Sequence, residues 1–354
     1  MLPNVCSGGI KSFGALALIM SCCASTYARA QQSPAASDAA SAKPGVPDIA
    51  PIGVPVAKFL DIPEAARGPR IDPSKGFRIE KLGEGLYLVT DSFYQSMFMV
   101  YETGVVVVDA PPSYAGKIGQ AIASVTNKPV THLIYSHAHI DHIGGAGTLG
   151  GHPIVIAQDE TARLLRRAAD PDRPLPTVTF AKSYTLKVGS QLLELSYPGN
   201  GHEPGNIQIY APAQKTLMYV DVVFPGWIPF RRFGVAQDVP GYFQQVRDLD
   251  RHPFEKLVGG HVNRIGTHAD VKLQIAFDDD IKAAVGAALK SEPFGPVPNS
   301  ADAGNQWAVI ADYTGRVART CVATMTPRWK DRIAGFDTFI WDQCYAMEQS
   351  LRVD

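Results

Sequence analysis

The residues best suited to bind a metal are concentrated in the segment Ser136-His137-Ala138-His139-Ile140-Asp141-His142. Three imidazoles and one carboxylate fall within six positions, between the apolar run His132–Tyr135 and the turn Gly144-Gly145. A strand end followed by a loop presents such side chains in fixed, converging directions. Zinc accepts nitrogen and oxygen ligands without demanding a rigid geometry, so this set suits zinc. The segment therefore predicts a metal site; the alternative is a polar loop whose histidines only make hydrogen bonds.

Three more candidate ligands follow along the chain. They are His202 in Gly201-His202-Glu203-Pro204-Gly205, Asp221 after the apolar run Leu217–Val220, and His261 after Leu257-Val258-Gly259-Gly260. An ionised Asp in apolar surroundings costs several kcal/mol unless a cation or a set of donors compensates it. A bridging metal ligand is the simplest account of Asp221. Taken alone, His202 or His261 would more often be an ordinary core or turn histidine.

Short strands and helices must bring these distant residues together. Strands are expected at Leu86–Thr90, Ser96–Tyr101, Val105–Val108, Val130–Tyr135, Ile154–Ala157, Ser183–Val188, Gln191–Ser196, Ile207–Ala211, Leu217–Val220 and Leu257–Val258. Helices are expected at Tyr114–Val125, Glu160–Ala169, Tyr242–Asp250 and His268–Ser291, and further helices over Ala301–Arg352, broken near Pro327 and Gly335. An opening meander followed by strands that alternate with helices predicts two packed sheets with helices outside.

The quoted motifs resemble the metallo-β-lactamase superfamily, specifically its dinuclear hydrolases, over about residues 77–285. Members carry an Asp that ends an early strand, a His-x-His-x-Asp-His motif, a later His, an Asp or Cys, and a final His. The resemblance implies an α+β fold of the αββα sandwich type, with two mixed sheets flanked by helices. We place this catalytic domain at residues 76–292, and a C-terminal helical extension at 301–354.

The resemblance also implies two zinc ions and their ligands. The first zinc would be held by His137, His139 and His202, the second by Asp141, His142 and His261, and Asp221 would bridge both. Hydrolysis would use a metal-bridging hydroxide, with Asp141 as the catalytic residue that orients it. Asp109, which ends the strand Val105–Val108, matches the early Asp and would support the ligands from behind. A helix cap before Ser113 is an equally good account of Asp109.

Two positions shape the expected substrate. Asp221 replaces the Cys of one β-lactamase group, and His139 stands where electron-transfer members carry Glu. The layout looks like that of the lactonase-like and thioester-hydrolysing members, so we expect a small ester, lactone, thioester or lactam. A β-lactamase proper and a metal-binding accessory protein without catalysis are the alternatives. Phe224, Trp227, Phe230 and Arg231 are expected to form a substrate wall, unless this strip packs against the leader or the C-terminal helices; Tyr94 could also face the site.

Residues 1–30 resemble a secretory signal peptide, with Lys11, the apolar run Phe13–Met20 and the cleavage site Ala28-Arg29-Ala30. That run is shorter than the roughly 20 residues needed to span a bilayer, so no stable membrane anchor is expected. Residues 31–75, rich in Ala, Pro, Ser and Asp, are expected to form a flexible leader that drapes over the domain. We therefore expect a periplasmic or secreted protein.

The remaining signals concern partners and cross-links. A formal net charge of −1 gives no sign of nucleic-acid binding, which leaves a small-molecule substrate as the partner. In an oxidising compartment Cys321 and Cys344 are expected to form a disulfide; the alternative is two buried thiols. The apolar C-terminal helices would form a disulfide-braced cap or a self-association surface, which leaves a homo-oligomer open.

Overall fold

The computed structural model of the protein describes residues 49–295 and 304–354, all within the unit Pro44–Asp354. The predicted signal peptide, and the predicted leader before residue 49, lie outside the described residues. Residues 49–75 are irregular apart from a short 3-10 helix, Glu64–Ala66. Among the described residues, no helix combines the length and apolar character needed to cross a bilayer.

The first sheet contains seven strands in sequence order, β1 to β7. They are β1 (Arg78–Gly83), β2 (Leu86–Thr90), β3 (Gln95–Val100), β4 (Val105–Val108), β5 (Val130–Ile134), β6 (Ile154–Gln158) and β7 (Val178–Phe180). Pairing is antiparallel from β1 to β4 and parallel from β4 to β7. Every residue of β4 is buried, as expected for a central strand covered on both faces.

The second sheet has the order β12-β11-β10-β9-β8. Its strands are β8 (Ser183–Val188), β9 (Gln191–Ser196), β10 (Gln208–Ala211), β11 (Thr216–Met218) and β12 (Lys256–Val258), with only β11 and β12 parallel among them. Alternate residues of β9 are buried, so this strand has one face on the core. Leu88 and Val106 of the first sheet share one apolar cluster with Leu193 and Ile209 of the second. The two sheets therefore pack face to face.

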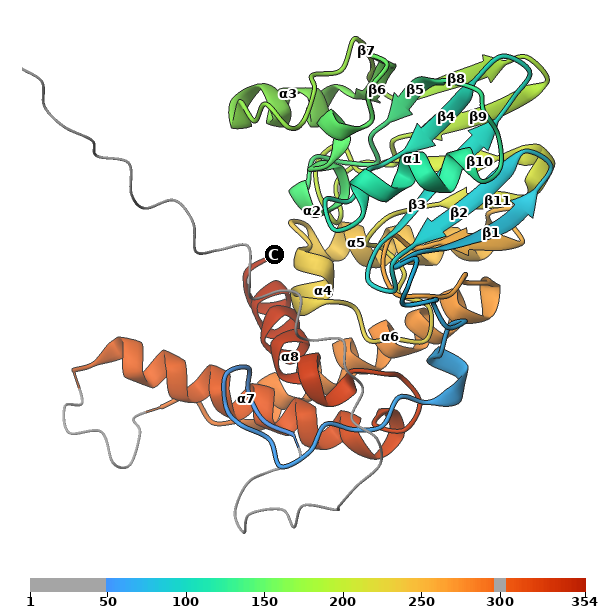
Figure 1. Cartoon of the computed structure of the whole chain (residues 1–354). Coiled ribbons are helices and arrows are strands. Elements are labelled where there is room, and N and C mark those ends of the chain that lie inside the picture. Colours follow the sequence, from blue (N-terminus) through green and yellow to red (C-terminus); the bar gives the residue numbers. More distant parts are fainter. Residues whose placement is uncertain (1–48, 296–303) are drawn as a thin grey trace, which may run out of the picture. The chain divides into compact units, whose positions relative to one another are not determined.

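Helices cover the outer faces of both sheets, as Figure 1 shows for α1 over the first sheet. Against the first sheet lie α1 (Ala115–Ala123) and α3 (Asp159–Ala168), which contribute Ile118 and Leu165 to one cluster with Leu133. Against the second lie α5 (Val239–Asp248) and α6 (His268–Ser291), through residues such as Val246 and Ile281. The predicted αββα sandwich is confirmed.

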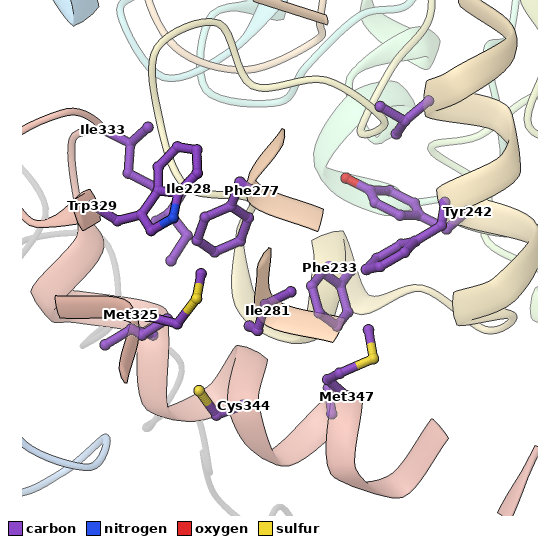
Figure 2. Close-up of a cluster of buried hydrophobic side chains, with 14 of the residues drawn as sticks. Ile228, Phe233, Tyr242, Phe277, Ile281, Met325, Trp329, Ile333, Cys344 and Met347 are labelled. Carbon is purple, nitrogen blue, oxygen red and sulfur yellow. The ribbon is translucent and has the colours of Figure 1, made fainter. Parts of the chain in front are cut away.

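Two C-terminal helices, α7 (Gln306–Trp329) and α8 (Phe336–Val353), extend the layer formed by α6. Cys321 and Cys344 are joined by a disulfide between them. Figure 2 shows Trp329 of α7 beside Phe277 of α6, and their rings lie 5.3 Å apart, edge to face. The predicted break near Pro327 and Gly335 is confirmed, because α7 ends at Trp329, two residues after Pro327, and α8 begins directly after Gly335. Trp329 itself is fully buried.

Strands β1 and β7 were not expected. β1 carries charged residues, Arg78, Glu80 and Lys81, and only one of its residues is buried. It lies at the edge of the sheet, where solvent tolerates charge and the alternating apolar pattern is weak.

Candidate metal centre

All seven predicted ligands meet at one edge of the sandwich, in two groups. His137, His139, His202 and Asp221 form one group, and Asp141, His142 and His261 form the other; within each, the ligand atoms lie within 4.8 Å of one another. The deepest members, His137 and His142, are fully buried. Asp141, His139 and His261 keep side-chain exposures of 40, 30 and 23%. The centre is therefore reached from the side of these three residues.

Asp221 lies between the two groups. Its Oδ2 is 3.2 Å from His202 Nε2 and 3.3 Å from His142 Nε2, while its Oδ1 is 3.1 Å from His261 Nε2. Burial alone would raise its pKa, but His142, His261 and His202 hold the pKa of Asp221 well below its usual range. A buried carboxylate within 3.3 Å of ring nitrogens from both groups is placed to act as a bridging ligand.

The surroundings of the predicted ligands shift their pKa values in different directions, and His137 and His139 are held neutral with a lone pair for a metal. Burial and the neighbouring histidines lower the pKa of His137 well below its usual value and that of His139 to about 4. Burial also disfavours a charge on His142, but Asp221 and other carboxylates outweigh it and raise the pKa of His142 to about 9. Metal bound there would displace a proton from His142.

Hydrogen bonds fix which ring nitrogen is free. His261 Nδ1 lies 3.0 Å from the carbonyl oxygen of Phe93, and His137 Nδ1 lies 2.9 Å from Ser136 Oγ. With Nδ1 engaged, Nε2 of each ring faces the centre. His137 Nε2 and Asp221 Oδ1 are buried and neither has a hydrogen bond of regular geometry among the described residues, although His261 Nε2 lies 3.1 Å from Asp221 Oδ1. Buried nitrogen and oxygen acceptors without donors are what a zinc ion satisfies, so these residues fit zinc.

Asp109 lies behind the ligand loop. It follows β4, is fully buried at φ +60°, and its Oδ1 accepts a 2.8 Å hydrogen bond from Ser136 N. Burial raises the pKa of Asp109 to about 6, against the opposing effects of His142 and Ser136. The alternative of a helix cap is wrong: α1 begins after Tyr114 with no side-chain cap bond in the described residues, and the hydroxyl of Ser113 donates to Asp91.

Glu203 is a second support that the sequence analysis did not single out. Its Oε2 accepts a 2.9 Å hydrogen bond from Ala138 N, and its Oε1 lies 3.4 Å from His139 Nε2. Burial raises its pKa. The only sequence signal for Glu203 was its position directly after His202. The neighbouring residues give no sign that this loop folds back onto residues 136–139.

A loop after β12 delivers His261. Gln95, at the start of β3, donates its N–H to Gly260 O at 2.7 Å and accepts from Gly259 N at 3.1 Å. Next to it, Tyr94 pairs with His261 and places its ring 4.8 Å from the imidazole. Burial, Asp141 and Asp221 raise the pKa of Tyr94 to about 12, so its phenol remains protonated. Tyr94 thus faces the site, as the sequence analysis allowed.

A pocket of about 760 Å³ opens beside His261, one of the predicted ligands. Phe224, Trp227 and Phe230 line it, as predicted for a substrate wall, and the Phe224 ring stacks on His261 at 5.8 Å. The assignment of Arg231 to this wall is wrong. Its Nε lies 3.2 Å from Asp342 of α8, and it does not line the pocket. The leader instead supplies two arginines, Arg67 and Arg70, which sequence reasoning missed.

The αββα sandwich with two ligand groups at its edge is the arrangement of the metallo-β-lactamase fold. Residues 89–261 match the model of the metallo-beta-lactamase superfamily. The structure is similar to a metallo-beta-lactamase from Pontibacter korlensis, with a TM-score of 0.50 and 22% identity over 57% of this chain and 99% of that one. This similarity shows the fold alone.

Two curated relatives are similar in sequence. The 2,4-dinitroanisole O-demethylase subunit alpha of Nocardioides sp. (strain JS1661) is 30% identical over 56% of this chain and 65% of its own length. The metallo-beta-lactamase type 2 of Elizabethkingia meningoseptica is 27% identical over 40% of this chain and 60% of its own length. The chain thus spans less than two thirds of either relative.

Proposed function

We propose that the protein is an exported, zinc-dependent hydrolase that cleaves a small ester, lactone, thioester or lactam with two zinc ions. The observation that carries this proposal is the position of Asp221, whose buried carboxylate lies within 3.3 Å of ring nitrogens from both ligand groups. An accessory protein that only stores metal has no need for a bridging carboxylate beside an open pocket.

Zinc ions held by these residues would supply Lewis acidity and an activated water at neutral pH. The chain's own groups arrange the rest. Asp141 Oδ2 lies 3.7 Å from His142 Nε2 and 3.8 Å from His261 Nε2, on the exposed side of the centre. From there Asp141 can accept a proton from water and pass it to the leaving group. The protonated hydroxyl of Tyr94 is a second donor near the same edge.

Export is supported by the sequence of residues 1–30 and by the Cys321–Cys344 disulfide, because disulfides persist in oxidising compartments. We propose a periplasmic or secreted location on these grounds. The near-neutral charge supports a small-molecule substrate rather than nucleic acid.

The test compares His139→Ala with wild type for zinc content and for turnover of matched esters, lactones, thioesters and a chromogenic cephalosporin. His152→Asn is the control, because His152 is exposed, lies outside both ligand groups, and adopts a positive φ that Asn tolerates. We expect His139→Ala to lose zinc and turnover and the control to retain both. Unchanged zinc content and activity in His139→Ala, or a zinc-loaded wild type inert on every substrate, would overturn the proposal.

An aryl ether is a second candidate, favoured by the relative whose name describes O-demethylation of 2,4-dinitroanisole. The aromatic pocket wall formed by Phe224, Trp227 and Phe230 suits such a ring. Release of 2,4-dinitrophenol by wild type, but not by His139→Ala, would assign this reaction to the same centre. Absence of release from the active enzyme would exclude it.

A further inference from the structure

The segment Ile62–Arg70 of the leader is fixed to the rim of the candidate active site. Trp227 Nε1 donates a 3.2 Å hydrogen bond to Ala66 O, and a Cβ on Gly226 would come within 2.8 Å of Ala66 Cα. Asn263, two residues after the ligand His261, donates from its side chain to Pro69 O. This stretch of the leader therefore contacts both loops that border the pocket.

Residues of this segment line the pocket beside His261 together with an apolar set of side chains. Phe224, Trp227 and Phe230 belong to that set, and Phe339 of α8 contacts Phe230 with ring centroids 5.2 Å apart. Phe93 and Ile62 at the mouth are 65 and 36% exposed. A molecule that enters from solvent therefore meets apolar and aromatic surface before it reaches the metal ligands.

Charge on the pocket lining comes from the leader side. Arg67, Arg70 and Glu64 are its charged residues besides the ligand His261, which leaves a surplus of one positive charge. Arg67 Nε lies 3.3 Å from Glu64 Oε2, but both side chains are more than half exposed, so this pair holds Arg67 weakly. Arg70 is exposed and has no ion-pair or hydrogen-bond partner within residues 49–295 and 304–354.

We propose that Arg67 and Arg70 bind an anionic group on the substrate, so that the substrate class is an ester-like molecule with an apolar body and a carboxylate remote from the bond that is cleaved. This inference rests on the proposed hydrolytic function. The scissile carbonyl lies at the metal ligands, the body packs along Phe224 and Trp227, and the carboxylate meets the guanidinium groups. Arg67 and Arg70 are binding residues here and take no part in bond cleavage.

The test uses pairs of 4-nitrophenyl esters with the same leaving group and acyl length: glutarate, adipate and suberate half-esters against the pentanoate, hexanoate and octanoate esters. The readout is the ratio of kcat/KM for the charged over the neutral ester. Arg67→Gln with Arg70→Gln should lower this ratio about 10-fold for the best-fitting length, mainly through KM. Added salt should lower the wild-type ratio and leave that of the double variant unchanged.

Two further variants sharpen the result. Arg166→Gln is the matched control, because Arg166 is exposed on α3 and does not line the pocket; its ratio should equal that of wild type. Glu64→Gln should raise the ratio, since it frees Arg67 and removes a repelling charge. An unchanged ratio in the double variant, or an equal drop in Arg166→Gln, would overturn the inference while leaving hydrolysis intact.

A binding experiment distinguishes failure of the proposed hydrolytic function from failure of the anion-binding inference. If zinc-loaded wild type hydrolyses none of the esters, binding of 4-phenylbutyrate and of 4-phenylbutan-1-ol is titrated by the fluorescence of Trp227, with Trp227→Phe as the blank. If wild type binds 4-phenylbutyrate more tightly than the alcohol, and the double variant loses this preference, the two arginines recognise an anion although the reaction is another one. Equal binding of both compounds, or no effect of the double variant, would overturn it.

Discussion

Two buried carboxylates hold the ligand loop from behind. Asp109 accepts from Ser136 N and Glu203 accepts from Ala138 N, so the backbone amides on either side of His137 are both fixed. A ligand between two anchored peptides keeps its ring direction without metal. These carboxylates set the geometry of the centre although neither is among its seven predicted ligands.

Asp109→Ala should weaken zinc binding about 10- to 100-fold, because Ser136 N loses its acceptor and the loop that carries His137 can shift. Competition against a chromophoric chelator measures the change. Ser113→Ala is the control: that hydroxyl contacts Asp91 rather than the ligand loop, so zinc affinity should stay at the wild-type value. Equal zinc affinity in Asp109→Ala and wild type would show that the loop needs no such support.

Asp278 of α6 is a buried acid away from the metal centre, 1% exposed, and its oxygens lack hydrogen-bond partners among the described residues. Burial raises its pKa well above the ordinary value; Arg247 opposes this and Asp279 adds to it. The folded state therefore keeps a proton that the unfolded chain releases near pH 4, so stability falls as pH rises above about 4, by at most about 1.4 kcal/mol per pH unit.

Asp278→Asn should remove this contribution and gain stability over wild type between about pH 6 and about pH 8 in urea unfolding. Asp279→Asn, at a neighbouring side chain that is 55% exposed and paired with Arg247, should not reproduce the gain. A pH dependence that is the same in wild type and Asp278→Asn would count against a protonated Asp278.

The residues of the candidate metal centre could be predicted because the motif from His137 to His142 is local, and because Asp221 and His261 each follow a recognisable strand by three residues. Arg231 was misassigned for the opposite reason. Its partner, Asp342, is 111 positions away on a helix whose packing no short pattern reveals. Arg67 and Arg70 were missed for a similar reason, since only the folded chain brings the leader to the loop after His261.

A left-handed turn links the strip that begins at Phe224 to α5. Residues 232–235 all have positive φ, between 51 and 72°, and a Cβ on Gly234 would come within 2.9 Å of Asp221 O. This conformation is costly for side chains other than glycine, so other contacts must hold it. Gln343 of α8, fully buried, accepts from Phe233 N at 2.7 Å and donates to the carbonyls of Pro229 and Phe230.

Gln343→Glu should release this turn, because the carboxylate keeps the acceptor for Phe233 N but cannot donate to the two carbonyls. We expect a loss of about 1 to 3 kcal/mol in stability and a higher KM for esters. Gln349→Glu, at another glutamine of α8 that faces solvent, is the control for added negative charge. A stable Gln343→Glu variant with wild-type KM would show that α8 does not position the strip.

The elements followed the sequence best where local signals were strong. The helix α6 begins and ends at the predicted residues, and its start carries a capping box between Thr267 and Asp270. The edge strand β1 gave no such signal. It pairs with one strand only and its charged side chains reach solvent, so its sequence lacks the alternating apolar pattern of a buried strand.

The C-terminal helices complete the core as well as covering it. Trp329, Phe336 and Cys344 are fully buried in the same cluster as Leu217 and Leu257 of the second sheet. The predicted disulfide-braced cap matches this arrangement, whereas self-association stays a prediction. Because one cluster spans sheet and extension, we expect them to unfold together.

Replacement of Cys321 and Cys344 by Ala should lower the free energy of unfolding by about 3 kcal/mol, since the bridge closes a loop across 23 positions. Urea unfolding of wild type with and without dithiothreitol provides the comparison. The reductant should shift the wild type towards the variant and leave the variant unchanged. A wild type insensitive to complete reduction, verified by mass spectrometry, would contradict this expectation.

The hydrogen bonds of Gln95 to Gly259 and Gly260 join the first sheet to the loop that follows β12 of the second. His142 and His261 come from these two halves and meet at 3.1 Å between their Nε2 atoms. An ion held by both histidines would act as a reversible cross-link between parts of the chain more than a hundred residues apart. By mass action, free zinc at 100 times its dissociation constant would favour the joined state by about 2.7 kcal/mol. The free zinc concentration in the compartment where the chain folds would then help to set the folded fraction of the protein.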